Sequence, residues 1–88
     1  MTDADVEEKI FALLAARRHG ATVCPSEVAR ALTAEGGPWR DLMPRVRQVA
    51  HDLAQNDRLN VTRGGMPVDA TRAGGPIRLG RPSDRRDP

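Results

Sequence analysis

The stretch 38–56, PWRDLMPRVRQVAHDLAQN, separates its apolar residues from its polar ones when it is wound at helical pitch. At about 100° per residue, the apolar side chains fall on a single stripe. That stripe consists of Trp39, Leu42, Val46, Val49, Ala50 and Leu53. The opposite side carries hydrogen-bonding and positive side chains, namely Arg40, Arg47, Gln48, His51 and Gln55. The stretch therefore predicts a helix that packs on a core with one face and offers a polar face to solvent.

Pro44 divides this stretch, because a proline inside a helix removes a hydrogen bond and clashes one turn back, at a cost of roughly 3 kcal/mol. We expect the regular helix to begin at or near Pro44 and residues 39–43 to form a separate turn. Trp39 and Leu42 are expected to pack into the core in either case. The outward placement of Arg40 depends on this turn, whereas that of Arg47 does not.

Two further helices are predicted before this one. The first covers residues 2–18, with an acidic first turn, a cap at Thr2 or Asp3, and a cationic last turn that ends at Gly20. The second opens at Pro25, where Glu27 is placed to reach back as in a capping box, and it ends at the glycines of 36–37. Between the two helices, residues 21–23 are expected to add a minimal strand to a later sheet.

The segments LNVTR (59–63) and PIRL (76–79) alternate apolar and polar residues and predict two strands of a β-hairpin. Their connection, 64–75, is long for a hairpin and suits a wing. Three helices followed by a hairpin have the order of a winged helix-turn-helix. We therefore predict a mainly helical α+β domain of this type over residues 1–80, with a C-terminal β-hairpin wing. The polar segment 81–88 is expected to be a disordered tail.

The composition limits the classes of function that such a chain performs. Its 88 residues allow one domain, and Phe11 and Trp39 are its two aromatic residues, too few for the stacking platforms that bind single-stranded nucleic acid. The net charge is only +2, but acids gather at the amino end and arginines in the carboxyl third. Arginine suits bidentate contacts with phosphate and guanine, although its preference over lysine also follows from a GC-rich genome.

Several kinds of site are not indicated. The single cysteine, Cys24, has no disulfide partner, and no apolar run approaches the roughly 20 residues that cross a bilayer. Without a signal-peptide core, a cytoplasmic location is expected. His19 and His51 lack ligand partners at metal-binding spacing, and no phosphate-binding glycine motif is found. We expect no metal, no cofactor and no enzymatic activity. Cys24 is interpreted as a small buried residue, with a reactive thiol as the alternative.

Three segments of the chain resemble a small bacterial family known as domain of unknown function 3253. They are TVCPSEVARAL, PWRDLMPRVRQVAHDLAQNDRLNVTRGGMPVD and GGPIRLG, and within them CPSEVAR, W..LMP.VR and GPIRL are the most specific parts. The resemblance covers approximately residues 6–79 and excludes the tail after Gly80. It implies a compact winged-helix fold and no particular ligand or activity.

These observations together favour a module that binds duplex DNA. Arg47, Gln48 and His51 are expected to face base edges, and Arg40 and Arg45 to contact phosphates. Arg63 and Arg72 are expected to reach DNA from the wing.

The wing also suggests a second hypothesis. The apolar sequence Met66-Pro67-Val68 at its tip suits a protein partner, bound together with the first helix, better than it suits DNA. A third possibility is that Met66 or Val68 folds back on the domain as a lid. The sequence does not indicate an oligomeric state.

Overall fold

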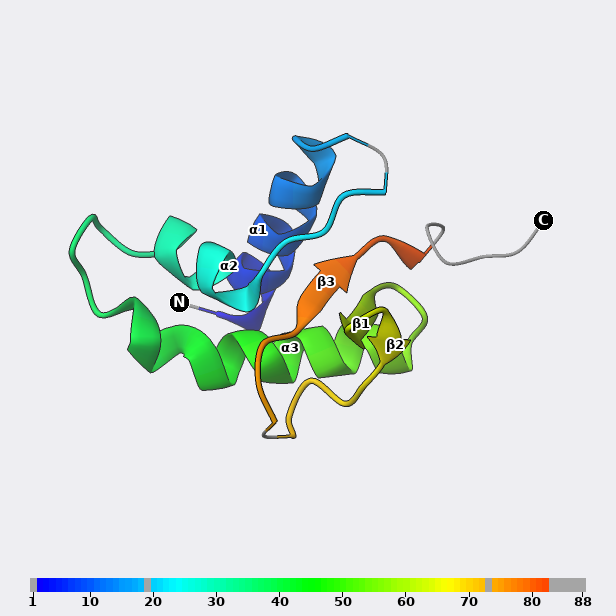
Figure 1. Ribbon diagram of the computed structural model, residues 1–88. Coiled ribbons are helices and arrows are strands. Elements are labelled where there is room, and N and C mark those ends of the chain that lie inside the picture. The colour runs from blue at the N-terminus through cyan, green and yellow to red at the C-terminus, as the bar shows by residue number, and fades with distance from the viewer. Residues whose placement is uncertain (1, 19, 73, 83–88) are drawn as a thin grey trace.

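The computed structural model describes residues 2–18, 20–72 and 74–82. Within these residues the chain is a small α+β domain of three α-helices and a three-stranded antiparallel sheet (Figure 1). The helices are α1 (Asp3–Ala15), α2 (Pro25–Ala31) and α3 (Met43–Gln55), and a 3-10 helix, η1 (Trp39–Leu42), directly precedes α3. The strands are β1 (Asn60–Arg63), β2 (Met66–Pro67) and β3 (Arg78–Gly80). No helix of this described part is long and apolar enough to cross a membrane.

Helix α1 begins as predicted but ends three residues earlier. The Thr2 N–H donates to Asp5 Oδ2 at 2.9 Å, and the Asp5 N–H donates to Thr2 Oγ1 at 3.2 Å, which forms a capping box. The expected cationic last turn is wrong, because α1 stops at Ala15. Arg17 lies beyond the helix and its side chain turns toward α2, where it pairs with Glu27.

Helix α2 also follows its predicted start and not its predicted end. Glu27 Oε1 accepts a hydrogen bond from the Cys24 N–H at 2.8 Å, as the capping pattern indicated. The helix ends at Ala31, well before the glycines expected to terminate it. Beyond this end the Thr33 hydroxyl donates to the carbonyl oxygens of Ala29 and Arg30, which satisfies acceptors that the end of the helix leaves open.

The effect of Pro44 is confirmed. The α-helix begins one residue before it, and Trp39–Leu42 forms the separate turn, η1. At the first positions of a helix, the missing N–H of proline has no partner to lose. Trp39 and Leu42 are half-buried and pack against the core.

The sheet differs from the predicted hairpin. Its strand order is β2-β1-β3, so β1 is central and pairs with both other strands. The predicted long loop after Arg63 is wrong at its start, because Gly64 and Gly65 take φ values of 59° and 84° and close a two-residue turn directly into β2. The expected minimal strand is confirmed, since Val23 bridges Leu79 through two backbone hydrogen bonds of 2.9 and 2.8 Å.

The core lies between the three helices and one face of the sheet. Its fully buried large side chains come from every part of the fold, and they are Val6, Ile10, Leu14, Val23, Val28, Val46, Leu59, Ile77 and Leu79. Arg81, placed in the predicted tail, is attached to this core: its Nη2 donates to Leu14 O at 2.6 Å, and its carbonyl accepts from Asn60 Nδ2 at 3.1 Å. Residues 83–88 of the predicted tail lie outside the described residues.

Candidate nucleic-acid interface

Helix α3 presents three strips around its axis besides the face it buries. Its buried residues are Val46, Val49, Ala50 and Leu53. Opposite them, Pro44, Gln48 and Gln55 are exposed and form the open strip of the helix. Arg47 and His51 lie on one flank, and Arg45 and the exposed Asp52 lie on the other. Each strip has different neighbours, and these decide what each side chain is free to contact.

The connection between β2 and β3, residues 68–77 without residue 73, lies across the flank of α3 that carries Arg47 and His51 (Figure 1). Arg47 Nη1 donates to the carbonyl oxygen of Ala70 at 3.4 Å, and Ala70 is itself buried. His51 Nδ1 lies 3.3 Å from Asp69 Oδ1. Arg47 and His51, both expected to face bases, are therefore half-buried beneath this connection.

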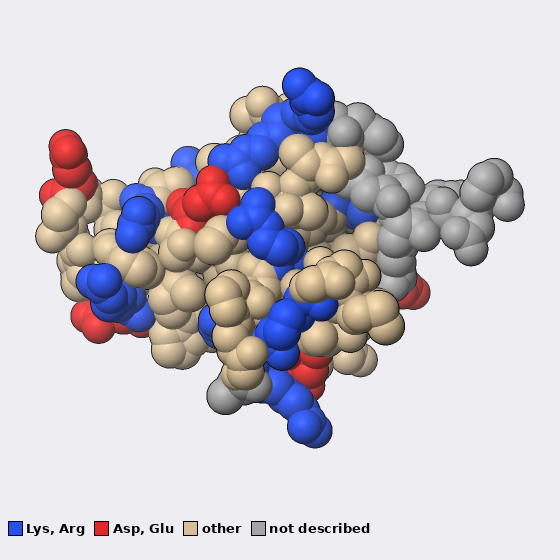
Figure 2. All heavy atoms as spheres, in the orientation of Figure 1, with Lys and Arg blue, Asp and Glu red and all other residues tan. Residues whose placement is uncertain are grey.

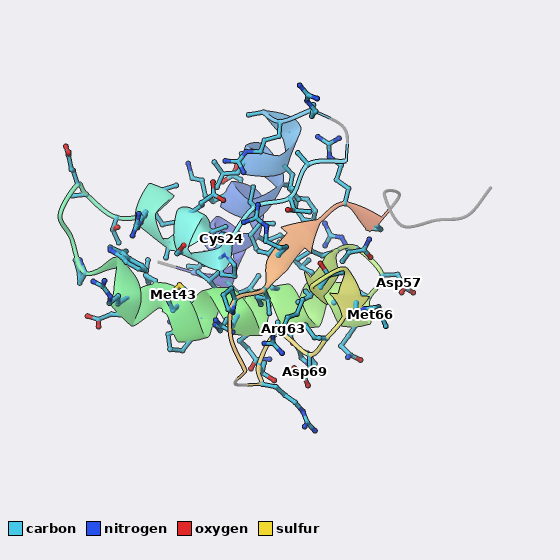
Figure 3. The ribbon with its side chains drawn as sticks, viewed as in Figure 1. Cys24, Met43, Asp57, Arg63, Met66 and Asp69 are labelled. Carbon is cyan, nitrogen blue, oxygen red and sulfur yellow. The ribbon has the colours of Figure 1, made fainter. Side chains whose placement is uncertain are left out.

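Arg63 holds the same connection at its other end. Its Nη2 donates to Gly75 O at 3.1 Å and its Nε donates to Pro76 O at 3.3 Å. Gly74 has a φ of +141°, and a Cβ there would lie 3.0 Å from Arg63 Nη1, so glycine lets the guanidinium approach the backbone. Figure 3 shows Arg63 and Asp69 near this connection, in front of α3.

Arg72 lies on the connection itself and is exposed. The β2–β3 connection thus brings together four of the seven predicted site residues, which are Arg47, His51, Arg63 and Arg72.

Asp69 is an acid in the middle of this cationic group. Hydrogen bonds from the hydroxyl and the backbone N–H of Thr71 lower the pKa of its carboxyl group, and the charges of His51 and Arg72 add to the effect. Asp69 is therefore ionised at neutral pH. It compensates part of the positive charge on this side of α3 and orders the turn 69–71.

The other three predicted residues lie apart from the connection. Arg45 Nη1 pairs with Asp3 Oδ1 at 3.2 Å, which binds α3 to the start of α1. Gln48 Nε2 donates to Asp52 Oδ1 at 3.1 Å on the surface of α3. The Arg40 guanidinium carbon lies 4.4 Å from the centroid of the Trp39 ring.

Two arginines outside the set of predicted site residues also belong to the charged surface. The Arg30 guanidinium carbon lies 4.4 Å from the Trp39 ring centroid as well. Arg78 donates from Nε to Thr22 Oγ1 at 2.8 Å and from Nη2 to Thr22 O at 3.1 Å. The alternation of Arg78 with Ile77 and Leu79 was a signal for its outward position. Figure 2 shows Lys and Arg side chains in a band beside β3 and along the β2–β3 connection.

Cys24 is half-buried rather than fully buried, and its Sγ lies 3.1 Å from Ser26 Oγ. Burial raises the pKa of the thiol, but hydrogen bonds from Ser26 and the charge of Arg78 outweigh it, so the pKa lies below its ordinary value. Across the described ranges, no group of three His, Cys, Asp or Glu side chains is placed to hold a metal ion.

Comparison with curated proteins gives no match for this chain. A family match covers residues 3–82, which is nearly the whole chain, and the family is described as a protein of unknown function, DUF3253. The matched region extends beyond the resemblance seen in the sequence and includes Arg81, in agreement with the contacts that Arg81 makes. The chain belongs to the DUF3253 family of proteins of unknown function.

Proposed function

We propose that this protein is a non-catalytic winged-helix module that binds duplex DNA. The order of its elements supports the proposal: α1, a one-residue strand at Val23, α2, α3, and then β1 and β3 joined by a long connection. The antiparallel sheet places β3 between Val23 and β1. In this arrangement α3 is the recognition helix and the β2–β3 connection is the wing beside it.

The observation that carries the proposal is the gathering of Arg47, Arg63 and Arg72 around the β2–β3 connection. Arg47 and Arg63 donate to backbone carbonyl oxygens, which hold the side chains without cancelling their charge. No carboxylate of the described residues lies within ion-pair distance of these three guanidinium groups. Asp69 offsets part of this charge, and the remainder is available to attract phosphates.

The open strip of α3 fits the floor of the major groove. Gln48 and Gln55 are exposed there, and glutamine amides pair with adenine edges. Arg47 and Arg45 flank this strip on its two sides, where the phosphates of a groove run. Arg47 and His51 reach bases only if the β2–β3 connection lifts from α3, whereas Gln48 reaches them without that movement.

Fluorescence anisotropy with labelled duplex DNA, measured over a series of salt concentrations, tests the proposal. We expect the affinity to fall as the salt concentration rises. Arg47→Ala and Arg63→Gln should each make the negative slope of log K against log salt shallower by about 0.9. Arg58→Gln is the matched control, because Arg58 pairs with Glu7 at 3.0 Å, next to α1. Undetectable binding at low ionic strength, or slopes unchanged in both variants, would refute DNA binding.

A second function is supported by the β1–β2 turn. Met66 is 67% exposed, and it is the exposed large hydrophobic residue of the described surface. Val68, next to it in the apolar sequence, instead packs against the core, as expected for a lid. An exposed methionine at a strand edge suits contact with a protein partner, reached together with α1. Chemical-shift changes on added duplex that spare α3 and the β2–β3 connection would mean non-specific attraction and would count against groove binding.

A further inference from the structure

Trp39 lies at the junction between α2 and α3. Two arginines lie over its ring, one from each side of this junction. Arg30 comes from the last turn of α2, and Arg40 follows Trp39 in η1. Both guanidinium carbons lie 4.4 Å from the ring centroid. The ring itself is half-buried and packs against the core, so it is a fixed support for two exposed cations.

Contact with an aromatic face leaves the guanidinium groups chemically available. The attraction comes from the charge distribution of the ring and uses no N–H···O hydrogen bond, so the donors at the guanidinium edges stay free for an oxygen ligand. No carboxylate of the described chain lies within ion-pair distance of Arg30 or Arg40. Their order also lowers the entropic cost of binding a ligand.

A surface hollow of about 490 Å³ lies beside the ring. It is lined by Arg30 and Trp39 on one side and by the α2–η1 loop, including Thr33 and Glu35, on the other. The Thr33 hydroxyl already donates to backbone carbonyls, so Arg30 is the side-chain donor that faces a ligand in the hollow, while Arg40 lies on the same Trp39 ring. Figure 2 shows Lys and Arg side chains near this loop, with acidic side chains beside them.

We propose that Arg30 and Arg40 form a phosphate-binding pair, positioned by Trp39, that grips the sugar-phosphate backbone at the border of the major groove. The proposal rests on the proposed function, because Arg40 lies in η1, which directly precedes α3, and Arg30 reaches the same Trp39 ring from α2. A recognition helix in a groove brings its preceding junction against the phosphates at the groove edge. The ligand is a phosphodiester group, and the contact carries no sequence information.

Salt-dependent binding of duplex DNA to the full chain tests the pair. We expect Arg30→Gln/Arg40→Gln to reduce the slope of log K against log salt by about 0.9 for each phosphate that is no longer neutralised. Trp39→Leu keeps both charges, so it should weaken binding less than the double variant, and Trp39→Phe should restore most of the affinity. Glu35→Gln should strengthen binding, because an acid at the edge of the hollow is removed.

Arg58→Gln is the matched control for this set. Arg58 also lies over an aromatic ring, 5.4 Å from the centroid of Phe11, but beside α1. Its substitution should leave the slope unchanged. Circular dichroism of each variant checks the fold, and because Arg30 and Arg40 are exposed, the double variant remains informative even if Trp39→Leu fails to fold.

Trp39 is the single tryptophan of the chain, so its fluorescence reports on the arginine pair alone. Together with duplex binding, this readout distinguishes failure of the phosphate pair from failure of the proposed function. Wild-type binding of duplex with an unchanged slope in the double variant overturns the phosphate pair and leaves DNA binding standing. A change in Trp39 emission with inorganic phosphate that the double variant lacks, without any duplex binding, supports the pair and refutes DNA binding. No response to either probe overturns both.

Discussion

Replacing Glu27 by glutamine should loosen the junction between α1 and α2 in a pH-dependent manner. Glu27 Oε1 accepts from the Cys24 N–H at 2.8 Å, and Glu27 Oε2 accepts from Arg17 Nη2 at 2.5 Å. Arg17 also donates to Thr22 O at 3.1 Å. A single carboxylate thus caps α2 and holds the segment that leaves α1.

The magnitude follows from these two interactions of Glu27. A capping hydrogen bond contributes about 1 kcal/mol, of which a glutamine oxygen retains a part. A partly exposed ion pair adds about 0.2–1 kcal/mol, and solvent screens this one because the side chains of Arg17 and Glu27 are 32% and 37% exposed. We expect Glu27→Gln to lower the free energy of unfolding by about 1 kcal/mol. For a chain of this length, the melting temperature should fall by about 4–8 °C.

The sign of the pH dependence follows from the pKa of Glu27. The Arg17 guanidinium and the Cys24 N–H hold the pKa of this carboxyl group below its ordinary value of 4.5. Folding therefore favours the charged form of Glu27. Its contribution to the free energy of unfolding is complete above the pKa of Glu27 in the unfolded chain, and it is lost as the pH falls through the pKa of Glu27 in the folded chain. The difference between wild type and Glu27→Gln should be full at neutral pH and shrink below about pH 4.5.

Urea unfolding followed by far-UV circular dichroism, at neutral and at acidic pH, measures this difference. Glu8→Gln is the matched control, because Glu8 is exposed on α1 and its replacement should change stability by less than about 0.5 kcal/mol. The reasoning is refuted if the Glu27→Gln difference is the same at both pH values. It is also refuted if the two substitutions cost the same at neutral pH.

Three other substitutions test separate parts of the structure. Ile77→Ala should cost about 2–5 kcal/mol in urea unfolding, because Ile77 is fully buried, whereas Met66→Ala should cost almost nothing; equal costs would contradict the placement of β3. Gly65→Ala should lower the melting temperature by an amount equivalent to about 1 kcal/mol, because the φ of +84° at Gly65 suits glycine. An unchanged melting temperature would contradict the two-residue turn. Thr71→Val should raise the pKa of the Asp69 carboxyl group toward its ordinary value, as followed by carbon NMR, and no upward shift would show that the Thr71 hydroxyl is not its main cause.

Local sequence signals predicted the helical part of the fold well. Pro44 marked the division between η1 and α3, and Glu27 marked the start of α2, because both effects act within one helical turn. The helix ends were less predictable. α1 stops early where Arg17 turns to a partner ten residues away, a contact that periodicity does not encode.

The sheet could be predicted only in part. Alternation located β1 and β3 but not β2, and the strand order depends on which edge of β1 each neighbour takes, which is decided by contacts distant in sequence. The glycines 64–65 are a recognised signal for a tight turn, and their inclusion in a longer loop hid β2. The covering of Arg47 and His51 follows from that hidden strand, which directs the chain back across α3.

The charges around α3 bear on the choice between the two proposed functions. The open strip of α3 carries the neutral amides Gln48 and Gln55, and Arg47 lies on one flank. The other flank carries Arg45, which pairs with Asp3, and the exposed Asp52, which accepts a hydrogen bond from Gln48. A major groove has base edges at its centre and phosphates at its borders, so the amides and Arg47 correspond to this pattern, whereas Asp52 does not. A protein interface has the reverse order, with an apolar centre and a polar rim. On the described surface the large exposed apolar side chain is Met66, on β2 and outside this strip, so the proposed protein partner is expected at the sheet edge and the proposed duplex at α3.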